Sequence, residues 1–300
     1  MNAPLITICI PAYNAGRYLP ATLASVRDQT FPDWELIVTE DGSKEGVEAL
    51  VRDFARTVSQ TVSYQRHEKN LGLPTTRNTG IAAARGEWIA LLDSDDLWAS
   101  DHLSSLVACA RERPAADFVH AGSLLFDSES GEKLEIRAPS PAAVRDYPRS
   151  LYLGHYVVQP SSVLLKKTLW ARVHGFNPAY RYVEDREMWL RCARAGAVFA
   201  CTGRNTCLYR KHAAALTTHA GPMALASAEV LQQHLEWDVA APEIRRRATA
   251  EAWTSAGRIA LRATPRLARD CFARAWRIRR SPRVACYWLA ACVCGLRRGH

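Results

Sequence analysis

The sequence lacks any long apolar run. A membrane-spanning helix needs about 20 consecutive apolar residues, and the longest candidate, Val284 to Leu296, is shorter than that. We therefore interpret it as a core helix or as a helix at an interface. The first residues, MNAPLITICIPAYN, lack a basic segment, and Pro11 and Asn14 interrupt their apolar stretch. This pattern predicts no secretory signal, and hence a cytoplasmic protein.

Cysteine pairs with the spacing of a zinc knuckle or a redox motif are also missing. The nine cysteines are odd in number and form no CxxC, and Cys9, Cys192 and Cys201 have apolar neighbours. Cys292 and Cys294 are separated by one residue, a poor spacing for zinc. We expect reduced, buried thiols rather than a disulfide framework or a metal site.

Acidic residues are scarce toward the C-terminus. The 300-residue chain has a net charge of +9, and residues 221–300 contain fourteen Arg, no Lys and six acidic residues, which is +8. Two interpretations stay open: a surface for an anionic partner, or a solvated helix face in an arginine-rich sequence. Because no aromatic–basic stacking pattern accompanies the arginines, we expect no nucleic acid partner.

The first part of the chain alternates strand and helix patterns, whereas the pattern is helical from residue 221 onward. Alternation of this kind predicts a mostly parallel sheet with helices on both faces. We therefore expect an α/β domain at 1–220 and a basic α-helical region at 221–300. The predicted strands are 5–10, 35–39, 62–66, 88–92, 118–126, 159–166, 198–201 and 207–209, and the predicted helices are 18–29, 48–57, 73–84, 169–174 and 184–195.

Polar clusters follow three of these strands: PAYN at 11–14, EDGS at 40–43 and DSDD at 93–96. The carboxyl ends of parallel strands share one edge of a sheet, where ligands bind. DSDD would either cap a helix that starts near Leu97 or hold a divalent cation against an anionic ligand. We favour the cation, because a cap needs one Asp and three neighbouring carboxylates repel one another. No glycine-rich phosphate loop is present, so phosphate binding would rely on metal and side chains.

Three segments carry a resemblance to a known family: IPAYNAGRYLPATLASVRDQTFPDWELIV with EDGS, NLGLPTTRNTGIAAARGEWIALLDSDD, and GFNPAYRYVEDREMWLRCARAG. Their order and spacing resemble the inverting family 2 glycosyltransferases of bacterial cell-surface polysaccharides. The resemblance covers roughly residues 5–215 and implies a GT-A fold, which is a Rossmann-like sheet that binds nucleotide-diphospho-sugars, with a C-terminal helical extension beyond it.

The resemblance identifies the DSD motif as a metal site. It implies that Asp95 binds Mn²⁺ or Mg²⁺ directly, that Asp93 contacts the ribose or the metal's waters, and that Ser94 belongs to the donor site. Hard carboxylate oxygens suit such an ion, which neutralises a diphosphate leaving group. His212 is similar to a family histidine near the metal, although lone histidines are often structural. Asp96 is expected to be a helix cap.

The resemblance also assigns the binding site for the nucleotide base. An acidic side chain can accept the N3–H of uracil, and an aromatic ring can stack on the base. The acid here is Glu40, where the family mostly has Asp, and Asp41 is left as a possible turn residue. Arg77 contacts the base or the phosphates, or else is a surface helix arginine. The residues implied in nucleotide-sugar binding are Pro11, Ala12, Tyr13, Glu40, Asn70, Arg77, Asp93, Ser94 and Glu184.

The pair Glu184-Asp185 is similar to the family's acidic pair, which implies that Asp185 is the catalytic base. A carboxylate must take the acceptor's hydroxyl proton as the new bond forms. The alternative is that acidic residues simply favour a helix N-terminus.

We thus predict a metal-dependent inverting glycosyltransferase, with a UDP-sugar as the favoured donor and a glycan or lipid-linked saccharide as acceptor. A nucleotidyltransferase and a non-catalytic nucleotide- or sugar-binding module are the alternatives. The C-terminal helices would contact the anionic inner membrane face peripherally or form a homodimer interface.

Overall fold

The computed structural model describes residues 3–44, 46–213 and 215–296. The chain forms two compact units, Met1–His212 and Ala213–His300. The strands of the first unit are β1 (Ile6–Ala12), β2 (Trp34–Glu40), β3 (Val62–Arg66), β4 (Trp88–Leu91), β5 (Leu97–Trp98), β6 (Phe118–Asp127), β7 (Lys133–Arg137), β8 (Val163–Lys166) and β9 (Phe199–Lys211). Its helices are α1 (Leu19–Arg27), α2 (Glu48–Ala55), α3 (Leu73–Ala83), α4 (His102–Glu112), α5 (Pro141–Arg145), α6 (Tyr147–Leu153), α7 (Lys167–Arg172) and α8 (Glu184–Arg194), with a 3-10 turn, η1, at Pro160–Ser162.

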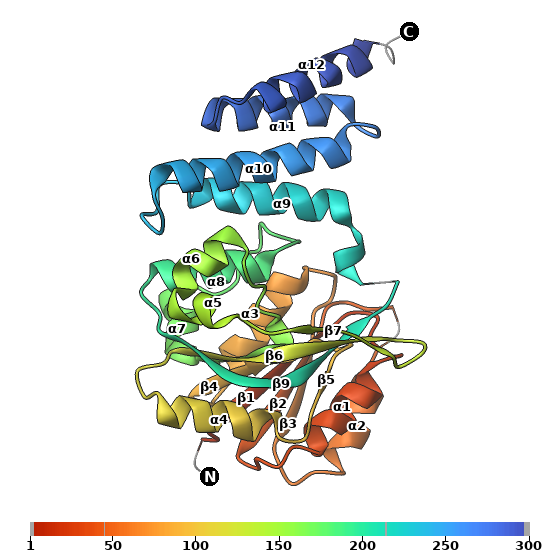
Figure 1. Ribbon diagram of the computed structural model, residues 1–300. Helices are drawn as coiled ribbons and strands as arrows, with labels where there is room; N and C mark the ends of the chain where they lie inside the picture. The colour runs from red at the N-terminus through yellow and green to blue at the C-terminus, as the bar shows by residue number, and fades with distance from the viewer. Residues whose placement is uncertain (1–2, 45, 214, 297–300) are drawn as a thin grey trace. The chain divides into compact units, whose positions relative to one another are not determined.

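Within the described residues, nine strands form one sheet in the order β3-β2-β1-β4-β8-β6-β9-β5, with β7 paired to β6 (Figure 1). The first four are parallel, whereas β8 runs antiparallel to both β4 and β6. The chain moves outward from β1 to β3 and then returns to place β4 on the other side of β1. This reversal creates a switch point between β1 and β4, and ligands of sheets of this kind bind at such a point, beyond the carboxyl ends of the strands.

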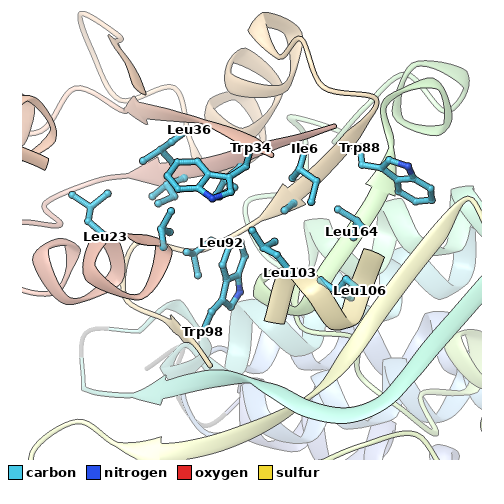
Figure 2. Packing of buried hydrophobic residues seen from close by; sticks show 14 of the residues in the cluster. Ile6, Leu23, Trp34, Leu36, Trp88, Leu92, Trp98, Leu103, Leu106 and Leu164 are labelled. Atoms are coloured by element: carbon cyan, nitrogen blue, oxygen red, sulfur yellow. The ribbon is translucent and has the colours of Figure 1, made fainter. Parts of the chain in front are cut away.

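Alternate residues of β1 face opposite layers. Ile6, Ile8 and Ile10 belong to a buried cluster that also contains side chains of α1, α2 and α4 (Figure 2). Cys9 faces α3, where a Cβ at Gly80 would lie 3.8 Å from the Cys9 Cβ. Helices therefore cover both faces of the parallel half of the sheet, which is the predicted α/β arrangement.

The sequence did not predict β5, α4, β7, α5 or α6, and further differences lie after residue 158. Residues 159–166 were expected to be one strand but form η1 followed by β8. The strands predicted at 198–201 and 207–209 are parts of one strand, β9, whose register against β6 shifts on both sides of Gly122. Pairing with β6 continues on both sides of residues 202–204, so the two predicted segments belong to one strand.

The second unit contains α9 (Ala220–Gln233), α10 (Pro242–Ala260), α11 (Pro265–Ile278) and α12 (Pro282–Leu296), preceded by η2 (Leu216–Thr218). Consecutive helices pack on one another. A Cβ at Gly257 of α10 would lie 2.6 Å from the ring of Phe272 of α11, so the glycine permits a close approach. The boundary between the two compact units lies between residues 212 and 213, and the domain boundary expected at 220/221 stays a prediction.

Among the described helices, none combines the length and apolar character that crossing a bilayer requires. Cys9 and Cys192 are buried and Cys201 and Cys292 half-buried, whereas Cys286 is exposed; all are free thiols. The side chain of Cys294 lies outside the described residues.

Candidate active site

The DSDD loop directly follows β4 and is fixed from three directions. Asp96 is 1% exposed, and its carboxylate accepts hydrogen bonds from Ser161 Oγ at 2.5 Å and from the backbone N–H of Arg210 at 2.9 Å. Ser161 Oγ also accepts from the backbone N–H of Asp93 at 3.0 Å. The hydroxyl of Thr22 donates to the carbonyl oxygens of Ser94 and Asp96 at 3.0 and 2.9 Å. Contacts from α1, η1 and β9 therefore set the loop's shape.

The expectation that Asp96 caps a helix is wrong. The chain continues from Asp96 into β5, and α4 begins only at His102, with Asp101 at its N-cap position. The buried indole of Trp98 donates to the carbonyl oxygen of Ser161 at 2.6 Å, which keeps this segment extended. Burial, together with Asp95 and Asp93, raises the pKa of Asp96 well above its ordinary value.

Asp95 pairs with His212 across the end of the sheet. The distance from His212 Nε2 to Asp95 Oδ2 is 2.9 Å, and the side chains are 9% and 34% exposed, respectively. The ring of Tyr18 lies 4.8 Å from the His212 ring, centroid to centroid. Arg210 Nε donates to the backbone carbonyl of Asp95 at 2.6 Å. The last residues of the first unit thus hold the loop that contains Asp95.

Arg77 is buried between two carboxylates. Its Nη2 donates to Asp93 Oδ1 and its Nη1 to Glu184 Oε1, both at 2.6 Å, and the residue is only 2% exposed. The alternative that it is a surface helix arginine is therefore wrong. Burial alone would lower the pKa of Arg77, but Asp93 and Glu184 outweigh burial and raise it. Burial and Asp95 also raise the pKa of Asp93, although Arg77 opposes them.

Glu184 and Asp185 form the first turn of α8. The residue before them, Val183, has a φ of 53°, an unusual left-handed conformation for a β-branched residue. Burial and the charge of Asp185 raise the pKa of Glu184 to about 7 against the opposing effect of Arg77. Burial and Asp93 raise the pKa of Asp185, whose Oδ1 accepts from the backbone N–H of Arg186 at 2.7 Å. Strained backbone and raised carboxyl pKa values coincide here, as they often do at functional sites.

Asn78 fixes the turn that precedes this acidic pair in sequence. Its side-chain amide donates to the carbonyl of Phe176 at 2.7 Å and accepts from the N–H of Phe176 at 2.8 Å. The adjacent Gly175 has a φ of 67°, and a Cβ there would lie 2.6 Å from Asn78 Oδ1. The ring of Phe176 in turn lies 5.3 Å from the Arg77 guanidinium carbon. Neighbouring residues of α3 thus hold both the acidic pair and the turn.

The residues expected to bind the base differ in accessibility. Pro11 and Ala12 are the last residues of β1 and are buried, whereas Tyr13 is 54% exposed and Asn70 is exposed. Glu40 is fully buried: its Oε2 accepts from the N–H of Val47 at 3.1 Å and from the Tyr64 hydroxyl. Its Oε1 is buried without a hydrogen-bond partner in the described part of the chain.

Asp41 is more than a turn residue. Its carboxylate accepts from the N–H groups of Leu71 and Gly72, each at 2.8 Å, and contacts His67 Nδ1 at 2.8 Å. These hydrogen bonds outweigh burial and lower its pKa. Asp41 therefore joins the end of β2 to the start of α3, the helix that contains Arg77.

The structure brings together the acidic residues predicted from two separate segments. Asp93 interacts electrostatically with both Asp95 and Asp185, so the DSD loop and the start of α8 face one region. Sequence reasoning missed Ser161 and Tyr18. Ser161 lies in QPSSV, where nothing in the pattern distinguishes its hydroxyl, and Tyr18 was counted only as part of a helix.

The candidate metal-ligating side chains fit an ion only in part. Among the described residues, no group of three or more His, Cys, Asp and Glu side chains is arranged to hold an ion. Asp95 and His212 offer two adjacent donors, and His212 Nδ1 is buried without a partner in that part of the chain. Nucleotide-bound Mg²⁺ commonly takes one or two protein ligands and completes its coordination with phosphates and water. A two-residue site therefore fits an ion that arrives with a diphosphate.

The sequence profile described as "Glycosyl transferase family 2" matches residues 7–169, more than half of the chain. TuaG of Bacillus subtilis, whose name provisionally assigns it to teichuronic acid biosynthesis as a glycosyltransferase, is 29% identical over 207 residues, which cover 68% of this chain and 77% of TuaG. The chain spans 61% of the length of each of the next three curated relatives.

Solved structures that this fold resembles include two that were determined with a nucleotide sugar. S. aureus TarS in complex with UDP-GlcNAc aligns with a TM-score of 0.69 at 16% identity, covering 96% of this chain and 84% of that one. The mannosyltransferase PcManGT of Pyrobaculum calidifontis, in complex with GDP-Man and Mn²⁺, aligns with a TM-score of 0.65 at 18% identity, covering 99% and 88%. From the profile match and this shared architecture, the chain belongs to glycosyltransferase family 2 and has a GT-A fold.

Proposed function

We propose that this glycosyltransferase moves a sugar, with inversion, from a nucleotide-diphosphate donor to a hydroxyl of a glycan or lipid-linked saccharide. The observation that carries the proposal is the buried Arg77, which bonds Asp93 and Glu184 at the same time. Asp93 belongs to the loop expected to bind the donor, and Glu184 adjoins the expected base, Asp185. The Arg77 guanidinium thus connects the loop expected to bind the donor with the segment that contains the expected base.

Asp95 and His212 would hold Mn²⁺ or Mg²⁺ beside the diphosphate. When bound, the ion neutralises negative charge on the nucleoside-diphosphate leaving group. The Mn²⁺ in the complex of the Pyrobaculum mannosyltransferase supports a divalent metal here. Asp93 Oδ1 is engaged by Arg77, so Asp93 would contact the ribose or the ion's waters through its other carboxylate oxygen.

UDP-sugars are the favoured donors, because TarS was solved with UDP-GlcNAc and because β2 ends in an acid, Glu40. Exposed Tyr13 is available to stack on the base. Glu40 Oε1, which lacks a partner in the described residues, is the atom left to accept N3–H of uracil. Since Glu40 is fully buried, this contact requires the segment after β2 to move.

Asp185 would act as the general base. It takes the proton of the acceptor hydroxyl while that oxygen bonds to the anomeric carbon and the bond from this carbon to the diphosphate oxygen breaks. Attack from the side opposite the leaving group inverts the configuration. The backbone N–H of Arg186 orients one carboxylate oxygen, and the raised pKa of Asp185 makes it a stronger base than an exposed carboxylate.

Screening of nucleotide sugars with Mn²⁺ tests this proposal. We expect release of a nucleoside diphosphate, accelerated by an acceptor, and a product of inverted anomeric configuration by NMR. Release of pyrophosphate from a nucleoside triphosphate and a sugar 1-phosphate, in a parallel assay, would instead indicate a nucleotidyltransferase. Donor binding without turnover for every donor and acceptor tried would favour a non-catalytic module, which the family match and the ordered acidic pair argue against.

A further inference from the structure

The helix α12 has an unusual composition for its position. It is the last helix in the row α9 to α12, and it packs on α11 (Figure 1). From Val284 to Leu296 the sequence VACYWLAACVCGL contains no charged residue. A helix with one face on the protein and one in water usually carries charged side chains on the outer face. Beyond Arg283, which is exposed in the first turn, the sequence of α12 therefore offers no charged side chain to an outer face.

The exposed fractions identify that face. Val284 and Ala291 are buried, and Ala291 lies seven positions, or about two turns, beyond Val284. Leu289 is 58% exposed and Trp288 40%, and the neighbouring Ala290 is also exposed. Large apolar side chains that are exposed side by side are typical of an interaction surface.

The charge around this face is of one sign. Residues 271–300 contain seven arginines and no acidic residue. Arg279, Arg280 and Arg283 immediately precede the apolar stretch and are exposed. In the sequence, Arg297 and Arg298 follow it directly. The apolar face is thus bracketed by positive charge in the chain.

We propose that the outer face of α12, with Trp288 and Leu289 as its main apolar contacts, docks on an anionic lipid surface. An uncharged stretch of 13 residues is too short to span a bilayer, which needs about 20. An apolar helix face with flanking arginines matches a helix that lies in the membrane interface, with its cations near anionic headgroups. A second copy on the same face would bring two sets of arginines together without any acidic partner.

This docking needs neither donor nor metal, so it can fail or succeed independently of the proposed reaction. Flotation of the full-length protein with vesicles tests it, comparing phosphatidylcholine alone with phosphatidylcholine containing phosphatidylglycerol. We expect binding to the anionic vesicles that weakens as salt is raised. Leu289→Glu should reduce the vesicle partition coefficient about tenfold or more, because it places a charge on the apolar face.

Leu134→Glu is the matched control, since Leu134 of β7 is similarly exposed, at 52%, but lies in the first unit. It should leave the partition coefficient within about twofold of wild type. The double variant Arg279→Gln/Arg280→Gln should weaken binding to anionic vesicles more than the double variant Arg145→Gln/Arg149→Gln, which removes the same charge from α5 and α6. Circular dichroism checks that each variant is folded.

Three results would overturn the proposal. They are no flotation with anionic vesicles, an equal loss of vesicle binding in Leu289→Glu and Leu134→Glu, or binding to neutral vesicles as strong as to anionic ones. A dimer in sedimentation velocity that Leu289→Glu converts to a monomer, without vesicle binding by the wild type, would assign the face to a second copy instead.

Discussion

Arg77 and Glu184 lie 107 positions apart in sequence, yet their side chains form a buried ion pair with an N–O distance of 2.6 Å. The second bond of Arg77, to Asp93, makes this one guanidinium the link between α3, the loop after β4 and the first turn of α8. A planar group with several donors in a fixed fork can bridge two carboxylates in a way that a lysine ammonium cannot.

Removal of the Arg77 guanidinium should destabilise the fold strongly. Arg77→Met leaves two carboxylates buried without their partner, and breaking a buried pair in this way costs about 3–5 kcal/mol. Urea denaturation followed by fluorescence measures the change in free energy of unfolding. Arg52→Met is the control: Arg52 is exposed and pairs with Glu48 on the same helix, so its loss should cost no more than about 0.5 kcal/mol. Equal losses in the two variants would contradict a structural role for the Arg77 bridge.

Turnover should depend on pH through the acidic pair. Burial and Asp185 raise the pKa of Glu184 to about 7, so the Glu184–Asp185 pair takes up a proton as pH falls below about 7. With Arg77, Arg186 and Asp93 as its charged neighbours, the pair then loses its basic form, and kcat/KM should fall toward acid pH. Glu184→Gln removes one negative charge beside Asp185, so the acid limb of the profile should move to lower pH. If the acid limb does not move in Glu184→Gln, it reports the titration of another group.

The same shift makes a prediction about stability. Because the pKa of Glu184 is higher in the folded state than its ordinary value of 4.5, the folded state binds more protons between about pH 4.5 and 7. This contribution to stability is present below that window and is lost as pH rises through it. Urea denaturation at several pH values should therefore show wild type losing stability relative to Glu184→Gln between pH 5 and 8. A difference between the two that does not vary with pH would contradict the shift.

Asp185→Asn should abolish transfer without abolishing donor binding. The amide keeps the shape of the carboxylate but cannot take a proton, and general bases typically contribute 10²–10⁴-fold to rate. Single-turnover kinetics should show a loss of about that size, while isothermal titration with UDP and Mn²⁺ should give an affinity within a few-fold of wild type. Normal turnover of this variant would rule out Asp185 as the base.

The sequence predicted the parallel half of the sheet well, because its alternating apolar β-branched runs and amphipathic helix patterns follow directly from which side chains are buried. The strand at 62–66 matches β3, and Arg77 joins a carboxylate after β4 to one at the start of α8. Asp96 and Ser161 show the limit of this approach. A buried carboxylate that orders a loop has the same local pattern as a helix cap, and its hydroxyl partner comes from a segment 65 positions away.

Removal of the metal, or of the histidine that would help to hold it, should weaken transfer. EDTA should abolish activity, and added Mn²⁺ should restore it. His212→Ala leaves Asp95 as the remaining proposed protein ligand, so we expect the Mn²⁺ concentration for half-maximal rate to rise at least about tenfold. His155→Ala, at an exposed position, is the control and should leave this concentration unchanged. Full activity in EDTA would exclude the proposed use of a metal.

Gly175→Ala tests whether α3 and the turn before α8 need their close contact. A Cβ at position 175 would meet Asn78 Oδ1 at 2.6 Å and Trp170 Nε1 at 2.7 Å, and the residue has a φ of 67°. Gly131 has a similar φ of 70° but nothing within 4 Å of the added atom, so Gly131→Ala measures the backbone strain alone, about 1–2 kcal/mol. We expect Gly175→Ala to cost about 1–3 kcal/mol more than Gly131→Ala in free energy of unfolding, which is the typical cost of overpacking.

A double-mutant cycle then separates the clash from other effects at position 175. Asn78→Ala removes the amide that the new methyl group would meet, together with its two hydrogen bonds to Phe176. If the clash is the cause, the losses from Gly175→Ala and Asn78→Ala will sum to more than the loss of the double variant, because the second change relieves part of the first. Strictly additive losses would mean that Asn78 and Gly175 act independently, and the turn would then owe its shape to Arg191, whose Nη2 donates to the Gly175 carbonyl at 2.7 Å.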